Sequence, residues 1–175
     1  MAVATPRIPS EDLTRQYQQI KWEIAAAIDS VLPSGKYTLG PALSRFEQEF
    51  ADYCGVRHCI GLSNGTEALH LALAAMNIGP GDEVITQANT YVATSFAINY
   101  VGAKPVFVDV DPVYFNMDPD KLEACITPRT KAIIPVHMYG HPCDMDRINE
   151  IAARHHVRVL EDASHAQGAP RSGNG

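Results

Sequence analysis

Residues 131–160, KAIIPVHMYGHPCDMDRINEIAARHHVRVL, place a helical segment between two short apolar segments. Residues 131–136 and 157–160 are rich in aliphatic and β-branched side chains, which favours strands. Residues 145–155 follow Asp144, a residue type that caps helices. A strand, a helix and a second strand in this order are typical of a parallel sheet with helices packed on its faces.

The same alternation extends back towards residue 57. The sequence predicts further strands at residues 57–61, 83–86 and 105–110, and helices at residues 66–76, 91–100 and 119–125, the last behind Asp118. Turn signals such as GPGD at residues 79–82 separate the units. The expected fold class is therefore α/β, with a mostly parallel sheet and helices on both faces.

The first 55 residues do not show this alternation of strands and helices. Apolar residues spaced three and four apart predict an amphipathic helix over residues 11–32 that ends at Pro33: Leu13, Tyr17, Ile20, Ile24, Ile28 and Val31. A flexible segment at residues 34–40 precedes a second helix that starts at Pro41 and ends at Gly55. We expect residues 1–55 to form a helical arm and clasp, and residues 56–175 to form the α/β domain.

Composition excludes several classes of protein. Of the 175 residues, 46% are hydrophobic and 19% charged, which is ordinary for a globular protein, and the net charge of −6 comes without the basic stripe that nucleic-acid binding needs. No apolar run approaches membrane-spanning length and the N-terminus lacks a signal-peptide pattern, so we expect a cytoplasmic protein without membrane or nucleic-acid partners. Neither disulfides nor a metal site are expected, because the grouping of His137, His141 and Cys143 lacks a fourth ligand at recognisable spacing.

Asn64, Gly65 and Thr66 are the candidate anion-binding residues. They stand where a predicted strand passes into a predicted helix, and unpaired N–H groups at a helix start favour a phosphate. Gly65 permits close backbone approach, and Thr66 adds a hydroxyl. Taken alone, these residues are more typical of a capped helix start than of a phosphate site, and they match neither the dinucleotide nor the P-loop fingerprint.

Asp162, Tyr91 and His165 are the other candidate site residues. Asp162 follows a predicted strand, on the edge of the sheet where Gly65 is expected, and its carboxylate suits a protonated ring nitrogen. Tyr91 can stack on a planar ring and His165 can donate to a phenolic oxygen. The alternatives are a turn cap for Asp162, a core aromatic for Tyr91 and an ordinary polar residue for His165.

Three residue pairs, Gly40-Pro41, Phe46-Glu47 and Phe50-Ala51, and five segments together resemble a known family. The segments are GLSNGTEALH (61–70), GPGDEV (79–84), TYVAT (90–94), PVHMYG (135–140) and EDASHAQG (161–168). They are similar to the DegT/DnrJ/StrS family of pyridoxal-phosphate (PLP) sugar aminotransferases, over about residues 34–169 and about the N-terminal half of a typical member. The resemblance implies the large domain of a PLP-transferase type I fold, aspartate aminotransferase-like and incomplete. It also implies that Gly65 and Thr66 hold the cofactor phosphate, Tyr91 stacks on the ring, Asp162 pairs with the pyridine nitrogen and His165 bonds the phenolic oxygen.

The family's Schiff-base lysine follows the aspartate by a little over twenty residues, so the resemblance places it beyond Gly175. None of Lys21, Lys36, Lys104, Lys121 and Lys131 matches that position, and we assign no catalytic residue within the chain. The loop-like residues 171–175 reinforce the expectation of a fragment that is inactive by itself, without the C-terminal half and small domain.

The resemblance implies amino transfer, commonly from glutamate, to a keto-sugar nucleotide. It also implies a homodimer in which the segment 35–40 of one subunit approaches the active site of the other. Family relatives acting on a cyclitol or aminohydroxybenzoate precursor, or as dehydratases, stay open. Two alternatives belong to other classes. One is a non-catalytic PLP-binding or dimerisation module, and the other a Rossmann dehydrogenase, which fits the alternation but lacks its glycine fingerprint.

Overall fold

The computed structural model of the chain describes residues 11–169, and the expected loop at residues 171–175 lies outside that range. By its internal contacts the chain divides into two compact units, Met1–Gly61 and Leu62–Gly175. That these units match the expected domains 1–55 and 56–175 stays a prediction.

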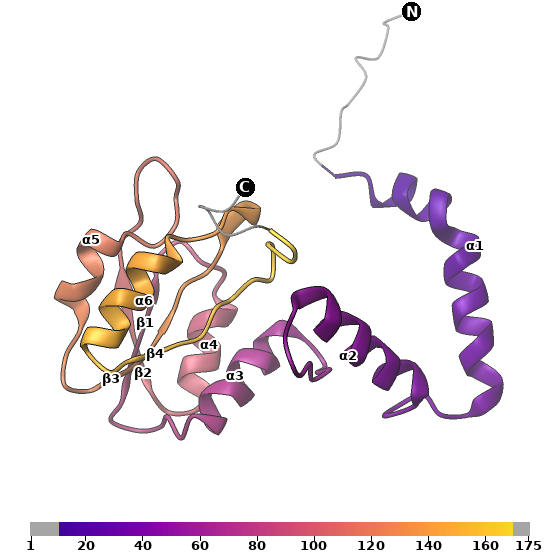
Figure 1. The fold of residues 1–175 in the computed structure, drawn as a ribbon, viewed down its shortest axis with the longest axis horizontal. Helices are drawn as coiled ribbons and strands as arrows, with labels where there is room; N and C mark the ends of the chain where they lie inside the picture. The colour runs from indigo at the N-terminus through magenta and orange to yellow at the C-terminus, as the bar shows by residue number, and fades with distance from the viewer. Residues whose placement is uncertain (1–10, 170–175) are drawn as a thin grey trace, which may run out of the picture. The chain divides into compact units, whose positions relative to one another are not determined.

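The first unit is helical, as predicted. Helix α1 (Leu13–Val31) runs into a short 3₁₀ turn, η1 (Leu32–Ser34), and helix α2 (Pro41–Cys54) follows (Figure 1). Asp12 caps α1 by accepting the Arg15 N–H at 2.9 Å, and α2 ends at Gly55, whose φ of 65° suits glycine. The predicted helices at 11–32 and 41–55 are therefore confirmed to within two residues.

Helix α1 has no buried residue. Its predicted apolar stripe, including Leu13, Tyr17 and Ile28, is exposed along its length, with 70% of Leu13 accessible to solvent. An amphipathic helix gains most of its stability from packing its apolar face, and α1 has no such packing within the described chain.

The strand predicted at residues 57–61 is wrong. These residues form no strand, and the Gly61 N–H donates to Glu47 Oε1 at 2.8 Å instead of to a neighbouring strand. Ile60 is 76% exposed. The apolar content of the segment resembles a strand, but a strand exists only where another strand pairs with it.

The second unit is built on a parallel sheet with strand order β2-β1-β3-β4. Its strands are β1 (Glu83–Gln87), β2 (Lys104–Val108), β3 (Thr130–Ile134) and β4 (Arg158–Val159). All four lie within two residues of the predicted strands, and the parallel arrangement confirms the expected α/β fold class.

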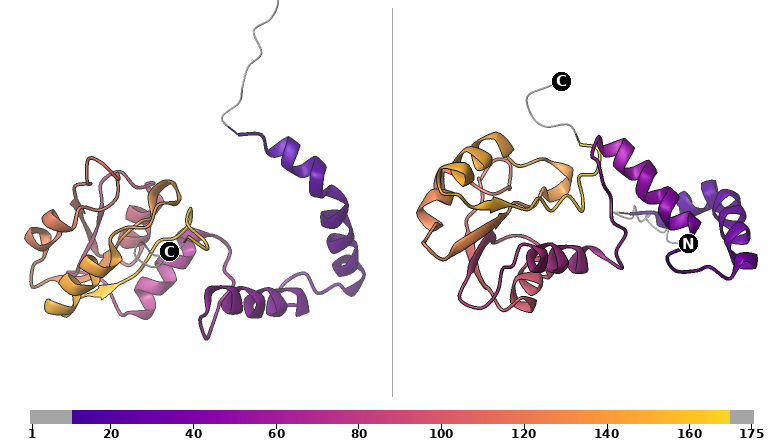
Figure 2. Two further views of the ribbon diagram at one scale, coloured as in Figure 1. Left: turned by 45° about the horizontal axis from the view of Figure 1, so that its top comes forward. Right: turned by 60° about the horizontal axis from the view of Figure 1, so that its bottom comes forward.

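Helices cover both faces of this sheet (Figures 1 and 2). They are α3 (Gly65–Ala75), α4 (Ala93–Tyr100), α5 (Pro119–Leu122) with the 3₁₀ turn η2 (Glu123–Cys125), and α6 (Met145–Arg154). A further 3₁₀ turn, η3 (Met138–Gly140), follows β3. The predicted helices are confirmed, although α4 begins two residues after the expected Tyr91.

Neighbouring residues of each central strand belong to opposite cores. Val84 of β1 and Ile134 of β3 pack with Leu73 of α3 and Ile98 of α4. This alternation buries both faces of β1 and β3, which explains why their sequences read as continuous apolar runs.

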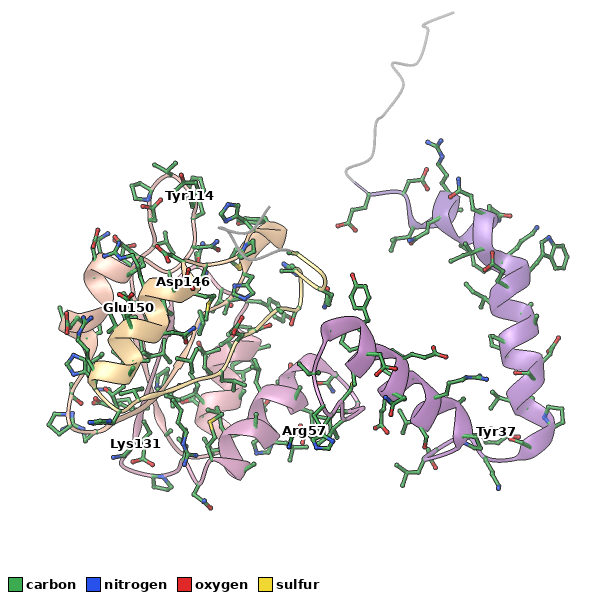
Figure 3. All side chains as sticks on the ribbon, in the orientation of Figure 1. Tyr37, Arg57, Tyr114, Lys131, Asp146 and Glu150 are labelled. Atoms are coloured by element: carbon green, nitrogen blue, oxygen red, sulfur yellow. The ribbon has the colours of Figure 1, made fainter. Side chains whose placement is uncertain are left out.

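The second core lies on the other face of the sheet. Ile85 of β1 and Ile133 of β3 pack there with Leu122 of α5 and Ile148 of α6. On α6 the polar side chains turn outward, and Asp146 and Glu150, labelled in Figure 3, are exposed.

Candidate functional site

A cavity of about 350 Å³ lies in the second unit, where the start of α3 meets the segments that follow β1, β3 and β4. Ligands of open α/β sheets collect at this carboxyl edge of the strands. The lining residues are Gly65, Thr66, Leu69, Thr90, Tyr91, Ala93, Thr94, Val136, Met138, Asp162, Ser164 and His165. Of the predicted site residues, Asn64 is absent from this lining and the other five are brought together.

Asn64 does not line the cavity and instead caps the N-terminus of α3. Its side chain accepts the Glu67 N–H at 2.9 Å, which satisfies one of the unpaired donors of the first turn. Within the described residues, no acceptor is found for the N–H groups of Gly65 and Thr66. These two groups, with the positive end of the helix dipole, suit an anion.

Gly65 keeps the cavity open at this end. A Cβ added to Gly65 would stand 3.5 Å from Ser164 Oγ, so it would occupy the space between α3 and the segment after β4. The segment before α3 is a loop rather than the expected strand, yet the helix start still reaches the strand edge that carries Asp162.

Tyr91 lies on the loop between β1 and α4 rather than inside the helix. The Thr90 and Thr94 hydroxyls are 3.1 Å apart, which ties this loop to the first turn of α4. Tyr91 is 76% exposed and lines the cavity, so its ring is available to a planar ligand rather than packed in the core.

Backbone pairing positions Asp162. Its N–H donates to Pro135 O at 2.9 Å, and its carbonyl accepts the His137 N–H at 3.1 Å. The two bonds extend the parallel pairing of β3 and β4 as a bridge between Val136 and Asp162. The aspartate is therefore fixed at the strand exit, as its place after an apolar segment predicted.

The carboxylate of Asp162 is held by its near neighbour Ser164. Ser164 Oγ donates to Asp162 Oδ1 at 2.5 Å, and the Ser164 N–H donates to the same oxygen at 3.2 Å. Sequence reasoning missed Ser164, although its spacing of two residues from an aspartate at a strand exit is the signal of such a local turn.

Two buried polar side chains of β1 support the same edge. Thr86 Oγ1 donates to Ile134 O at 3.0 Å, and Gln87 Oε1 accepts the Val136 N–H at 3.1 Å. Gln87 Nε2 also donates to Asn89 Oδ1 at 3.1 Å, at the start of the loop that carries Tyr91. Both side chains are fully buried, so these bonds rigidify the cavity's floor.

His137 is a second buried support, next to Asp162. Its Nε2 lies 3.1 Å from Glu161 Oε2, and its Nδ1 accepts the Cys143 N–H at 3.1 Å. The Cys143 side chain and the Glu161 carboxylate raise the pKa of His137 to about 9. The hydrogen bond from the Cys143 N–H opposes this rise in the pKa of His137, because an N–H can donate only to an unprotonated Nδ1.

The cavity has the chemistry of a site for a phosphorylated aromatic ring. Its lining combines free N–H donors and a hydroxyl at the start of α3, the carboxylate of Asp162, and the apolar side chains of Leu69, Val136 and Met138. No lysine lines the cavity, and residues 11–169 contain no group of His, Cys, Asp or Glu side chains arranged for a metal ion.

The family model described as "DegT/DnrJ/EryC1/StrS aminotransferase family" matches residues 18–174 of the chain. The chain belongs to this family. The match confirms the resemblance read from the five sequence segments, four of which contribute residues to the cavity lining.

A curated relative and two solved structures illustrate the family. The dTDP-3-amino-3,4,6-trideoxy-alpha-D-glucose transaminase of Streptomyces venezuelae is 49% identical over 94% of this chain and 44% of its own length. DesV of S. venezuelae is 47% identical with a TM-score of 0.92, over 98% of this chain and 47% of that structure. NtdA of Bacillus subtilis, solved with bound cofactor PMP (pyridoxamine phosphate), is 43% identical with a TM-score of 0.84, over 86% of this chain and 34% of that structure.

The chain thus spans about half the length, or less, of these family members. The similarity to DesV and NtdA confirms the expected PLP-transferase fold for the part that this chain covers. Within residues 11–169, the structure contains no helix with the length and apolarity required to cross a bilayer.

Proposed function

We propose that this chain is the cofactor-holding part of a PLP-dependent aminotransferase that transfers an amino group from glutamate to a keto-sugar nucleotide in amino-sugar biosynthesis. The observation that carries the proposal is the convergence of Gly65, Thr66, Tyr91, Asp162 and His165 on one cavity. The family match and the sugar named for the Streptomyces relative support the substrate class.

The start of α3 holds the cofactor phosphate in this proposal. Gly65 and Thr66 supply N–H groups and the Thr66 hydroxyl, while Asn64 contributes by capping the helix and leaving those donors free. Glycine leaves more room for the phosphate, because a Cβ at position 65 would lie beside Ser164 Oγ, at 3.5 Å, in the lining of the cavity.

The ring end is formed by the other three residues. Tyr91 stacks on the pyridine face, His165 donates to the phenolic oxygen, and the Asp162 carboxylate keeps the ring nitrogen protonated. PLP, when bound, supplies an electron sink that stabilises negative charge on the carbon bearing the amino group. A protonated nitrogen makes that sink effective, so Asp162 carries the largest share of the chemistry among the described residues.

The lysine that the family resemblance requires is not matched within residues 1–175, and none lines the cavity. We therefore expect the 175-residue chain to bind the cofactor reversibly and to show no transaminase turnover. A second candidate, a non-catalytic PLP-binding or dimerisation module, is favoured by the exposed apolar stripe of α1. Amino transfer to a keto-sugar nucleotide by the intact protein that contains this chain would exclude that candidate.

The proposal includes a homodimer in the cytoplasm, with residues 1–55 as a separate arm. The exposed stripe of α1 supports an association surface, because apolar helix faces of this length are usually covered. Sedimentation of the intact protein measures the dimer directly, and a monomer at micromolar concentration would contradict it.

Cofactor titration of the chain tests the site. We expect PLP to bind with a change in its absorbance, Thr66→Ala to weaken binding about tenfold and Asp162→Asn to weaken it by a similar factor through loss of a charge-assisted bond. Asp146→Asn is the matched control, because Asp146 is an exposed carboxylate on α6 outside the cavity. Equal affinity for the wild type and both site variants would contradict the proposed cofactor site.

A further inference from the structure

We propose that Ser164 is a positioning residue that orients the Asp162 carboxylate. Ser164 donates hydrogen bonds to one carboxylate oxygen, which leaves the other oxygen to bind the ring nitrogen of the cofactor. The inference rests on the proposed function, because it assigns Ser164 a task in the PLP site. Ser164 was not among the residues that the sequence singled out.

The contacts of the carboxylate are unequal. Asp162 Oδ1 receives two donors from Ser164, the hydroxyl at 2.5 Å and the N–H at 3.2 Å. Among the hydrogen bonds of residues 11–169, none is found to Oδ2. An oxygen with no protein partner in a ligand-sized cavity is the one left to bind a ring N–H.

The backbone of Asp162 does not determine which carboxylate oxygen is left for the ring N–H. Its N–H and carbonyl are bonded to Pro135 and His137, which fixes the main chain. The side chain still rotates about χ1 and χ2, and χ2 of aspartate has a broad energy minimum. Ser164 removes that freedom, because its hydroxyl and N–H hold the same oxygen from a fixed turn.

Ser164 also stands between the two ends of the site. It lines the cavity, and its Oγ lies 3.5 Å from the position that a Cβ on Gly65 would occupy. Ser164 is therefore part of the cavity wall near the start of α3 as well as the donor to Asp162. The property that the inference needs is its hydroxyl, which alanine lacks and threonine keeps.

The test uses the 175-residue chain and PMP labelled with ¹⁵N in its ring. The dissociation constant reports affinity, and the ¹⁵N chemical shift reports whether the ring nitrogen is protonated. We expect Ser164→Ala to weaken PMP binding by on the order of tenfold and to move the ¹⁵N shift towards neutral pyridine. Ser164→Thr keeps the hydroxyl and restores the wild-type shift.

Thr66→Ala is the matched control within the same cavity. It removes a phosphate contact, so it weakens PMP binding while the ¹⁵N shift of the bound ligand stays that of the wild type. A purely structural role for Ser164 would behave like Thr66→Ala. Circular dichroism of each variant checks that the α/β unit is folded.

The outcomes separate the two hypotheses. If wild-type chain binds PMP with a protonated ring and Ser164→Ala leaves both affinity and shift unchanged, the inference is overturned and the proposed function stands. If wild-type chain does not bind PMP, the proposed cofactor site is overturned, and the role of Ser164 with it. A shifted ¹⁵N signal in Ser164→Ala that Ser164→Thr reverses supports the inference.

Discussion

Helix α1 and strand β3 are both apolar along one or more faces, but they differ in what covers them. None of the residues of α1 is buried, whereas every residue of β3 except Lys131 is buried between two layers of helices. Among residues 11–169, the strand has packing partners and the helix has none that bury its side chains. An apolar pattern therefore predicts the type of element, while stability depends on a second surface.

Hydrogen exchange gives the sharpest form of this comparison. We expect the amides of β1 and β3 to exchange only through global unfolding, and those of α1 to exchange through local opening, roughly a thousandfold or more faster. Mass spectrometry of proteolytic fragments measures both in one sample. Equal protection of Leu13–Val31 and Thr130–Ile134 would show that something already covers α1.

A matched pair of isoleucine substitutions tests the same difference through the free energy of unfolding. Ile133→Ala removes a fully buried side chain of β3 and should lower the free energy of unfolding by about 3 kcal/mol. Ile24→Ala removes a side chain that is 38% exposed on α1 and should cost less than about 1 kcal/mol. Urea denaturation measures both, and a cost for Ile24→Ala as large as that for Ile133→Ala would contradict the comparison.

The two helix caps allow a smaller test. Asn64 accepts the Glu67 N–H at 2.9 Å in α3, and Asp12 accepts the Arg15 N–H at 2.9 Å in α1. Asn64→Ala should reduce the free energy of unfolding of the α/β unit by about 1 kcal/mol. Asp12→Ala should reduce helix content measured by circular dichroism and leave the unfolding midpoint of the α/β unit unchanged. A shift of that midpoint by Asp12→Ala would show that the two units unfold together.

The smallest expected effect is the pH dependence from His137. Its raised folded pKa of about 9 means that its stabilising contribution is complete below the unfolded value of about 6.5 and is lost as pH rises between the two. The Cys143 amide at Nδ1 offsets part of this, so we expect a loss on the order of 1 kcal/mol over that interval.

His137→Gln is the comparison variant for this measurement. It should abolish the pH dependence, while α1, which contains no histidine, keeps the same helix content across the interval. A wild-type chain whose free energy of unfolding is constant from pH 6.5 to 9 would show that the amide determines the protonation of His137.

Much of the fold was accessible from local patterns. The helices 11–32 and 66–76 and the strands 83–86 and 131–136 follow from the period of apolar residues and from caps, which depend on residues close in sequence. The strand predicted at residues 57–61 was wrong because it depended on a partner far away in the sequence. The segment has a strand-like composition, but a strand needs a partner that local sequence does not specify.

The site divides in the same way. Gly65, Thr66, Tyr91, Asp162 and His165 were identifiable because each stands at an element boundary with suitable chemistry, and the family resemblance placed them in order. Their roles in binding the cofactor stay predictions. The loop position of Tyr91 could not be read from helix periodicity, since the Thr90 and Thr94 contact that shapes the turn depends on three-dimensional structure.

By itself the sequence determined the main helices, the four strands of the sheet, the parallel α/β architecture and the family, because periodicity, capping and motif order are properties of neighbouring residues. Only the tertiary structure decided which strands pair, that Asn64 stands behind the cavity, and that Ser164 holds Asp162. It also showed that no residue of α1 is buried by the part of the chain that the structure describes. These features depend on side chains and backbone segments meeting in space, which pairing and packing across the chain determine.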